Sequence, residues 1–440
     1  MHDTNRMIQA GCAVAVITPP AGAQMAGYFK PRTVRRVRDD LYARALALGT
    51  GGEALLVVSC DLIAMPAEIA DAVKAAVLHK HGVPPAQVCI CATHTHTGPE
   101  IRENTPVACD PAYNRSLVEA LLAVTDRALS SRFDACLSYG AGEAAGLAFN
   151  RLYRLRDGSE IFGRLKPREH EIVGPAGPVD PSVQVVAVRD AAGKIRAIMV
   201  NFACHPDTYG LANGDFVSAD WPGEMARVLR AAYGEDAVVI FLQGCRGDLN
   251  HVNYDGPPGE PKSGEHKTVQ LGRGVAGAAM LAIERSLAIA GRPLAARLDS
   301  LEIPYYRRDA SILREAAELR RREQISPKDQ YFASRVESWP FDGQAAQVPI
   351  QAMRLGEVGL VALPAEIFTA VGMEIKRYAP SSKTMVVELA NARVSSYVPT
   401  EAQAERGGYG AKPILTRHLS AEAARLMSDT AVKMLHEVWA

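Results

Sequence analysis

Aromatic residues and excess charge are both scarce in this sequence of 440 residues. Phe, Trp and Tyr make up 6% of the chain, and no basic stripe is interleaved with them. Lysine plus arginine and aspartate plus glutamate are balanced at 49 each. Because nucleic acids and anionic membrane surfaces are both attracted by a positive field, neither is expected as a partner.

Long apolar runs are also missing. No stretch approaches the ~18 uninterrupted apolar residues that a membrane-spanning helix needs. Residues 1–12, MHDTNRMIQAGC, contain no apolar signal core. We therefore expect a cytoplasmic protein with no stable membrane anchoring.

Several catalytic signatures are absent or misplaced. The chain has no Cys-x-x-Cys, His-Glu-x-x-His or Gly-x-Ser-x-Gly element. Gly272–Gly277 fits Gly-x-Gly-x-x-Gly, but it lies in a Gly/Ala-rich helical stretch, which favours close helix packing over dinucleotide binding. The eight cysteines behave as reduced, buried residues, although Arg246 beside Cys245 would favour a thiolate there.

Apolar runs that alternate with helical spacing predict an α/β fold. Hairpins interrupt the alternation, so we expect mixed β-sheets flanked by helices. The expected buried strands and hairpins are 54–60, 88–90, 183–202, 237–242 and 350–363. The region 298–440 is a candidate subdomain, in which 326–343 and 391–412 are predicted to be loops.

Two histidines follow the strand at 88–90, in the stretch Cys91–Glu100 (CATHTHTGPE). His94 and His96 are two residues apart, and in extended backbone such residues point to the same side. Imidazole is the commonest protein ligand for zinc. This loop is therefore a candidate half of a metal site, the alternative being two solvated histidines without a role.

Other polar side chains also stand at the ends of apolar strands, where ligands of α/β sheets gather. They are Asp61, His205, and Asp248 with Asn250. Glu366 follows the strand at 360–363, where it either begins a helix or completes a His-His-Glu set. Such a set leaves a position open for water, as catalytic zinc requires, so we predict one metal site at the strand ends.

Nine motifs, in order, resemble the catalytic domain of the neutral/alkaline (non-lysosomal) ceramidase family. The match covers about residues 9–415. The motifs are GCAVAVITPPAGAQMAGY, DDLYARAL, CATHTHTGPE, FNR, NFACHPD, SADWPGE, FLQGCRGDLN, LPAEIFT and YVPTEAQAERGGY.

The resemblance implies one Zn²⁺ per chain, held by His94, His205, Glu366 and Tyr397. It implies that His96 faces the substrate, and that Arg151 and Tyr409 occupy the family's other catalytic positions. Asn250 stands where the family carries a serine. The family's C-terminal immunoglobulin-like domain is lacking, so residues 1–440 are expected to form one ceramidase-like catalytic domain.

The chemistry implied is cleavage of a C–N amide bond, N-acyl or cyclic, by zinc-bound hydroxide. Arg151 and Tyr409 would hold the oxyanion, and His96 would hold it or protonate the leaving amine. Asn250 would donate a hydrogen bond to the substrate. Asp220 and Asp248 would orient a ligand histidine through its other ring nitrogen, or else cap a turn or helix.

Three alternatives remain at this point. The same zinc site could cleave an ester or lactone. Asp61, His94, Asp248 and His251 could instead form a two-metal phosphoesterase, or the chain could be a zinc-binding protein without turnover. The favoured partner is a small-molecule amide whose acyl and amine parts the sequence does not specify. Lack of the second domain would expose an apolar surface, which favours a homo-oligomer.

Overall fold

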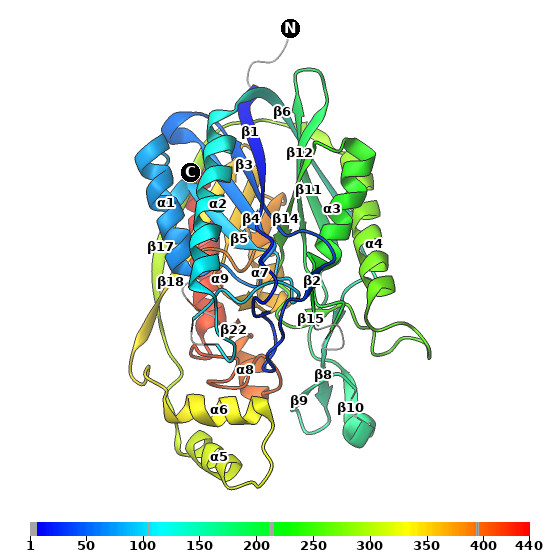
Figure 1. The fold of residues 1–440 in the computed structure, drawn as a ribbon, viewed down its shortest axis with the longest axis vertical. Helices are drawn as coiled ribbons and strands as arrows, with labels where there is room; N and C mark the ends of the chain where they lie inside the picture. Colours follow the sequence, from blue (N-terminus) through cyan, green and yellow to red (C-terminus); the bar gives the residue numbers. More distant parts are fainter. Residues whose placement is uncertain (1–6, 104, 165, 211–214, 393, 395) are drawn as a thin grey trace.

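The computed structural model describes residues 7–440 except 104, 165, 211–214, 393 and 395. The chain forms four layers, helix–sheet–sheet–helix (Figure 1). The first layer contains α1 (Ala67–His81), α2 (Pro111–Ser130), α3 (Asp220–Tyr233) and α4 (Glu265–Glu284).

Within the described residues, no helix combines the length and apolar character that crossing a bilayer requires.

The second layer is a nine-stranded sheet of order β14-β12-β11-β6-β1-β3-β4-β5, with β16 also paired to β6. The pairs β12–β14 and β4–β5 are parallel and the others antiparallel, so the predicted mixed sheet is confirmed. Its strands are β1 (Met7–Val16), β3 (Tyr42–Leu48), β4 (Leu55–Cys60), β5 (Val88–Ala92), β6 (Phe133–Glu143), β11 (Ser182–Asp190), β12 (Ile195–Phe202), β14 (Val238–Gln243) and β16 (Leu287–Ile289).

Both faces of this sheet are buried, which explains its continuous apolar strands. Along β3, Ala43 and Ala45 face the first helix layer, whereas Leu46 and Leu48 face the second sheet. This alternation follows from the two-residue period of a strand. The small alanines let α2 lie close to the sheet.

The third layer is a four-stranded sheet made of β17 (Leu294–Pro304), β18 (Ala345–Leu355), β19 (Val358–Ala362) and β21 (Thr384–Val387). Its inner face shares one apolar core with the nine-stranded sheet through residues such as Leu360 and Met385. Its outer face is covered by α7 (Thr369–Tyr378) and α9 (Ala423–Trp439). The division at residue 298 and the single catalytic domain stay predictions.

A helical hairpin connects β17 to β18 at the end of the molecule opposite the start of β1 (Figure 1). It consists of α5 (Ala310–Arg320) and α6 (Pro327–Glu337). The predicted loop at 326–343 is therefore wrong over most of its length. The missed signal is Ser326-Pro327: Ser326 Oγ accepts the N–H of Asp329, and Pro327 is the first helical residue.

Short paired elements surround the edge where β5 and β12 end. In the predicted loop at 391–412, the structure contains β22 (Tyr397–Val398) and α8 (Glu401–Arg406), while residues 393 and 395 lie outside the described part. Strand β22 pairs with β20 (Glu366–Ile367), so Glu366 does not begin a helix; α7 begins at Thr369. The other short strands are β2 (Arg36–Val37), β7 (Phe149–Asn150), β8 (Leu152–Leu155), β9 (Glu160–Phe162), β10 (Ile172–Pro175), β13 (Phe216–Val217) and β15 (Leu249–Asn250).

The Gly-x-Gly-x-x-Gly stretch lies inside α4, as expected for helix packing. A Cβ on Gly272 would lie 2.7 Å from Glu224 Cβ and 2.9 Å from the Trp221 carbonyl oxygen on α3, whereas a Cβ on Gly277 would meet nothing within 4 Å. We expect Gly272→Ala to lower the free energy of unfolding by about 1–3 kcal/mol. Gly277→Ala should raise it by up to about 1 kcal/mol. Urea denaturation measures both, and equal effects would contradict close α3–α4 packing at Gly272.

Candidate metal centre

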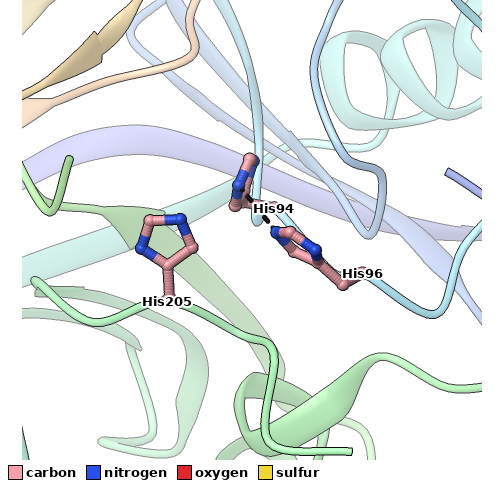
Figure 2. A group of neighbouring side chains, drawn as sticks. All are labelled: His94, His96 and His205. Atoms are coloured by element: carbon pink, nitrogen blue, oxygen red, sulfur yellow. Dashed lines mark hydrogen bonds between the residues drawn. The ribbon is translucent and has the colours of Figure 1, made fainter. Parts of the chain in front are cut away.

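Three histidines meet beyond the ends of β5 and β12, as Figure 2 shows. Among the described residues, His94, His96 and His205 form a group whose possible ligand atoms all lie within 4.8 Å of one another. The Nε2 atoms of His94 and His96 are 3.1 Å apart. The rings of His94 and His205 are 5.0 Å apart between centroids. The predicted gathering of histidines at strand ends is therefore present.

The backbone reason for this gathering differs from the predicted one. His94 has φ 76°, in the left-handed region, so the stretch from His94 to His96 is not an extended strand. Its N–H donates to the Leu62 carbonyl at 2.8 Å, and the N–H of His96 donates to the Pro206 carbonyl at 3.1 Å. These hydrogen bonds to neighbouring loops hold a strained backbone that the pattern of alternate residues could not predict.

His94 and His205 both present a neutral Nε2 to the centre. His94 Nδ1 is 2.6 Å from the Ile63 carbonyl oxygen, and His205 Nδ1 is 2.7 Å from that of Leu249. A carbonyl oxygen can only accept, so each Nδ1 carries the proton and each Nε2 keeps its lone pair. Burial and nearby arginines hold both pKa values well below the usual 6.5. Hydrogen bonds to the backbone thus leave two nitrogen lone pairs available to a metal ion.

Glu366 supplies an oxygen to the same centre. Its Oε2 is 3.5 Å from His94 Nε2 and 3.6 Å from His205 Nε2. Ligands about 2.0–2.1 Å from a tetrahedral cation lie roughly 3.3 Å apart, so this spacing fits a zinc-sized ion. Burial alone would raise the pKa of Glu366, but His94 and Arg246 outweigh it and lower the pKa to about 2.

Tyr397 reaches the centre because Glu366 and Tyr397 are direct partners in the parallel pair β20–β22. Its phenol hydrogen-bonds to the Glu366 carboxylate. Burial, then Glu366, raises the pKa of Tyr397 well above its usual 10. The phenol is therefore neutral here, and a bound cation would be needed to stabilise the phenolate.

Arg151 and Tyr409 lie beside this group. Arg151 Nη2 donates to the Gly247 carbonyl at 2.6 Å and to Tyr397 Oη at 3.2 Å, and Nη1 is 3.4 Å from His205 Nε2. Its guanidinium stands 5.0 Å from the centre of the Tyr409 ring. Tyr409 hydrogen-bonds to Tyr397, and burial raises its pKa. Both side chains are hydrogen-bond donors held in place next to the candidate ligands.

Two aspartates predicted to orient a ligand histidine do not do so. The Nδ1 atoms of both histidines are paired with backbone carbonyls instead. Asp248 accepts the N–H and Oγ1–H of Thr369, both at 2.8 Å, and Asp220 bonds to Thr208. Both carboxylates therefore fix the loops around the site, which corrects the expectation that they orient a ligand.

The two-metal phosphoesterase set is not assembled. Asp61 forms an ion pair of 2.7 Å with Arg44. His251 Nε2 is 3.0 Å from the Lys262 carbonyl oxygen, and Asp248 is engaged with Thr369. None of these three belongs to the histidine group among the described residues. The phosphoesterase alternative is therefore dropped.

Asn250 has local partners in this structure. Its Oδ1 accepts the N–H of Val252 at 3.0 Å, and its side chain also hydrogen-bonds to Tyr254. The side chain is buried. A role for Asn250 toward the substrate stays a prediction.

Arg246 is the residue that the sequence analysis missed at this site. Its side chain is fully buried, with Nη1 2.8 Å from Glu366 Oε2 and Nε 3.0 Å from Glu388 Oε1. The sequence signal was a charged residue, next to Cys245, in the loop that follows the apolar strand at 237–242. Cys245 itself is buried, and burial and Glu388 raise its pKa well above 9, so it is a thiol and no nucleophile.

A cavity of about 590 Å³ opens onto the centre. His94, His96 and Glu366 line its inner end, together with Tyr397 and Tyr409. The α5–α6 hairpin and its flanking loops form the opposite wall, contributing Tyr305, Tyr331, Arg335, Ser338, Pro340 and Phe341. A small molecule in this cavity would therefore contact the candidate ligands at one end and the hairpin at the other.

Two solved structures share this fold. The neutral ceramidase from Pseudomonas aeruginosa superposes with a TM-score of 0.75 at 19% identity, covering 97% of this chain and 74% of that one. A ceramidase complexed with C2 gives 0.74 at 19% identity with the same coverage. No protein-family model matches the sequence, and no curated protein matches it. The ceramidase resemblance of the motifs is therefore confirmed at the level of the fold: this chain is folded like neutral ceramidase.

Proposed function

We propose that this protein is a zinc-dependent hydrolase that cleaves a C–N amide bond in a small molecule. One observation carries the proposal: Glu366 Oε2 lies 3.5 Å from His94 Nε2 and 3.6 Å from His205 Nε2, and His94 and Glu366 line the inner end of a cavity. Two solved proteins that share this fold are ceramidases, which act on an amide-containing substrate. The cytoplasmic location and a homo-oligomeric state stay predictions.

The donor set fits one zinc ion. His94 and His205 would bind it through Nε2, Glu366 through Oε2, and Tyr397 is proposed as the fourth ligand. When bound, zinc lowers the pKa of a water molecule to about 7 and polarises a carbonyl group. His94, His205 and Glu366 form the set of three nitrogen and oxygen ligands that is typical of catalytic zinc, and Tyr397 would add a further oxygen ligand.

Arg151 and Tyr409 are proposed to receive the negative charge that develops on the amide oxygen. Hydrogen bonds to Gly247 and Tyr397 already hold the Arg151 guanidinium, so little reorganisation is needed during the reaction. Tyr409 keeps its proton, because burial raises its pKa, and can donate it in a hydrogen bond. Together they form an anion-binding wall beside the candidate ligands.

His96 is proposed to move the proton to the leaving amine. Its backbone carbonyl accepts from Arg32 Nη2 at 2.6 Å, and its ring packs edge-on against Tyr28 at 5.4 Å, so the ring position is fixed. It lines the cavity, unlike His205. Burial lowers the pKa of His96, so its ring is neutral near pH 7 and can accept a proton and pass it to the leaving amine.

Removal and return of the metal tests this function. With a chelator, hydrolysis of an N-acyl-7-amino-4-methylcoumarin should fall by at least about a hundredfold, since the metal contributes several kcal/mol to the barrier reduction. One equivalent of Zn²⁺ per chain should restore it, and Mg²⁺ should not. The matched ester of 7-hydroxy-4-methylcoumarin is the comparison substrate. Turnover of the ester without the amide would replace the proposed amidase with an esterase.

A further inference from the structure

The cavity wall opposite the histidines carries a cation that has no anionic partner among the described residues. Arg335 lies on α6 and lines the cavity together with Tyr331 of the same helix. The two residues are four positions apart, so they lie on one face of α6. That face is turned toward the candidate metal centre, and Figure 1 shows α6 beneath the main body of the molecule.

Arg335 has no acidic residue paired with it in the described part of the chain. No hydrogen bond or ion pair joins it to another described residue, and its Nε is buried without a partner. Its guanidinium lies 5.1 Å from the centre of the Trp339 ring, four residues further along the chain. A half-buried guanidinium with an unsatisfied N–H is costly unless an anion binds it.

The other charged groups of the cavity are already balanced or exposed. Arg102 is held by Glu100 through contacts of 2.7 and 2.8 Å, and Glu366 is paired with Arg246. Glu103 is exposed at the rim and forms no ion pair with Arg335. His418 adds no charge, because burial and Arg335 lower its pKa to about 3. The wall formed by the hairpin is therefore left with the unbalanced positive charge of Arg335.

We propose that the substrate is an amide bearing a carboxylate, such as an N-acyl amino acid, and that Arg335 binds this carboxylate. The planar guanidinium suits a bidentate bond to a carboxylate. Tyr305, Tyr331 and Phe341 in the same wall would contact an apolar part of the molecule. This inference rests on the proposed function, because it places the amide at the histidines while the carboxylate lies at α6.

The test compares N-acetyl-L-phenylalanine with N-acetyl-2-phenylethylamine, which has the same amide and ring but no carboxylate. In the native zinc protein, kcat/KM should be at least about tenfold higher for the carboxylate compound. Arg335→Gln should lower kcat/KM for that compound by about 10- to 100-fold and change the neutral one by less than about threefold. Arg320→Gln, which removes an arginine of α5 paired with Glu337 at the surface, is the control and should change neither.

Binding measured by calorimetry separates this inference from the proposed function. If neither compound is hydrolysed but the carboxylate compound binds at least about tenfold more tightly, and Arg335→Gln removes the difference, the anion site stands and the amidase proposal falls. If both are hydrolysed equally by native protein and Arg335→Gln, the amidase stands and the anion site is overturned. The proposed anion site is also overturned if the carboxylate compound does not bind. If Arg335→Gln does not fold, Arg335→Lys is measured instead. Lysine keeps the positive charge but not the planar guanidinium, so affinity for the carboxylate compound should fall about three- to tenfold.

Discussion

Replacing His205 with alanine should reduce zinc from about one ion per chain to near none and lower amide turnover by roughly a thousandfold or more. His205 supplies one of the two neutral Nε2 atoms, and its Nδ1–H is fixed by the Leu249 carbonyl. Without it, His94, Glu366 and Tyr397 remain, and His94 is then the single neutral nitrogen ligand, so the ion is held much less tightly. Elemental analysis of the purified protein measures the metal, and circular dichroism checks that the variant is folded.

Two further variants make this result specific. His251→Gln changes another buried histidine, which contacts the Lys262 carbonyl outside the group, and should keep its zinc. His96→Gln should keep zinc but lose turnover, because His96 is proposed to face the substrate. Loss of zinc in His96→Gln would make His96 a ligand instead. Zinc that persists in His205→Ala would overturn the ligand set.

Arg246→Met should lower the free energy of unfolding by about 3–5 kcal/mol. Arg246 is fully buried between Glu366 and Glu388, so its removal leaves two buried carboxylates without their cation. Glu388 is itself fully buried, and burial raises its pKa to about 8 despite Arg246. Urea denaturation near neutral pH measures the loss.

The matched control is a surface arginine. Arg227→Met removes an ion pair of 2.7 Å between the exposed Arg227 and Glu224, which Arg273 also contacts, and should cost less than about 1 kcal/mol. Adding Glu388→Gln to Arg246→Met should recover part of the loss, because one of the two buried carboxyl groups left without a partner is then removed. Equal effects of Arg246→Met and Arg227→Met would mean that the buried cation is unimportant for stability.

The meeting of the histidines could be predicted from sequence because polar residues follow apolar strands at a shared sheet edge. The backbone geometry of the histidine loop could not be predicted from the sequence. His94 adopts a left-handed φ because its N–H bonds to Leu62, more than thirty residues earlier in the chain. A pattern of alternate residues contains no information about such a contact.

Glu366 and Tyr397 show a second limit. They are brought together by two strands of two residues each, which are too short to produce a periodic signal. Tyr397 was identified only through the motif resemblance. Arg246 was missed because both its carboxylate partners are more than a hundred residues away in sequence. Helix α6 was missed although its Ser-Pro start was visible, because the stretch has few apolar residues.

The candidate ligands come from two different sheets, which are held together by one shared apolar core. His94 and His205 follow strands of the nine-stranded sheet, whereas Glu366 follows β19 of the four-stranded sheet. The distance between His94 Nε2 and Glu366 Oε2 therefore depends on how Leu360 and Met385 pack against the first sheet. A core substitution far from the cavity would alter metal affinity, and a bound ion would in turn crosslink the layers and delay their separation on heating.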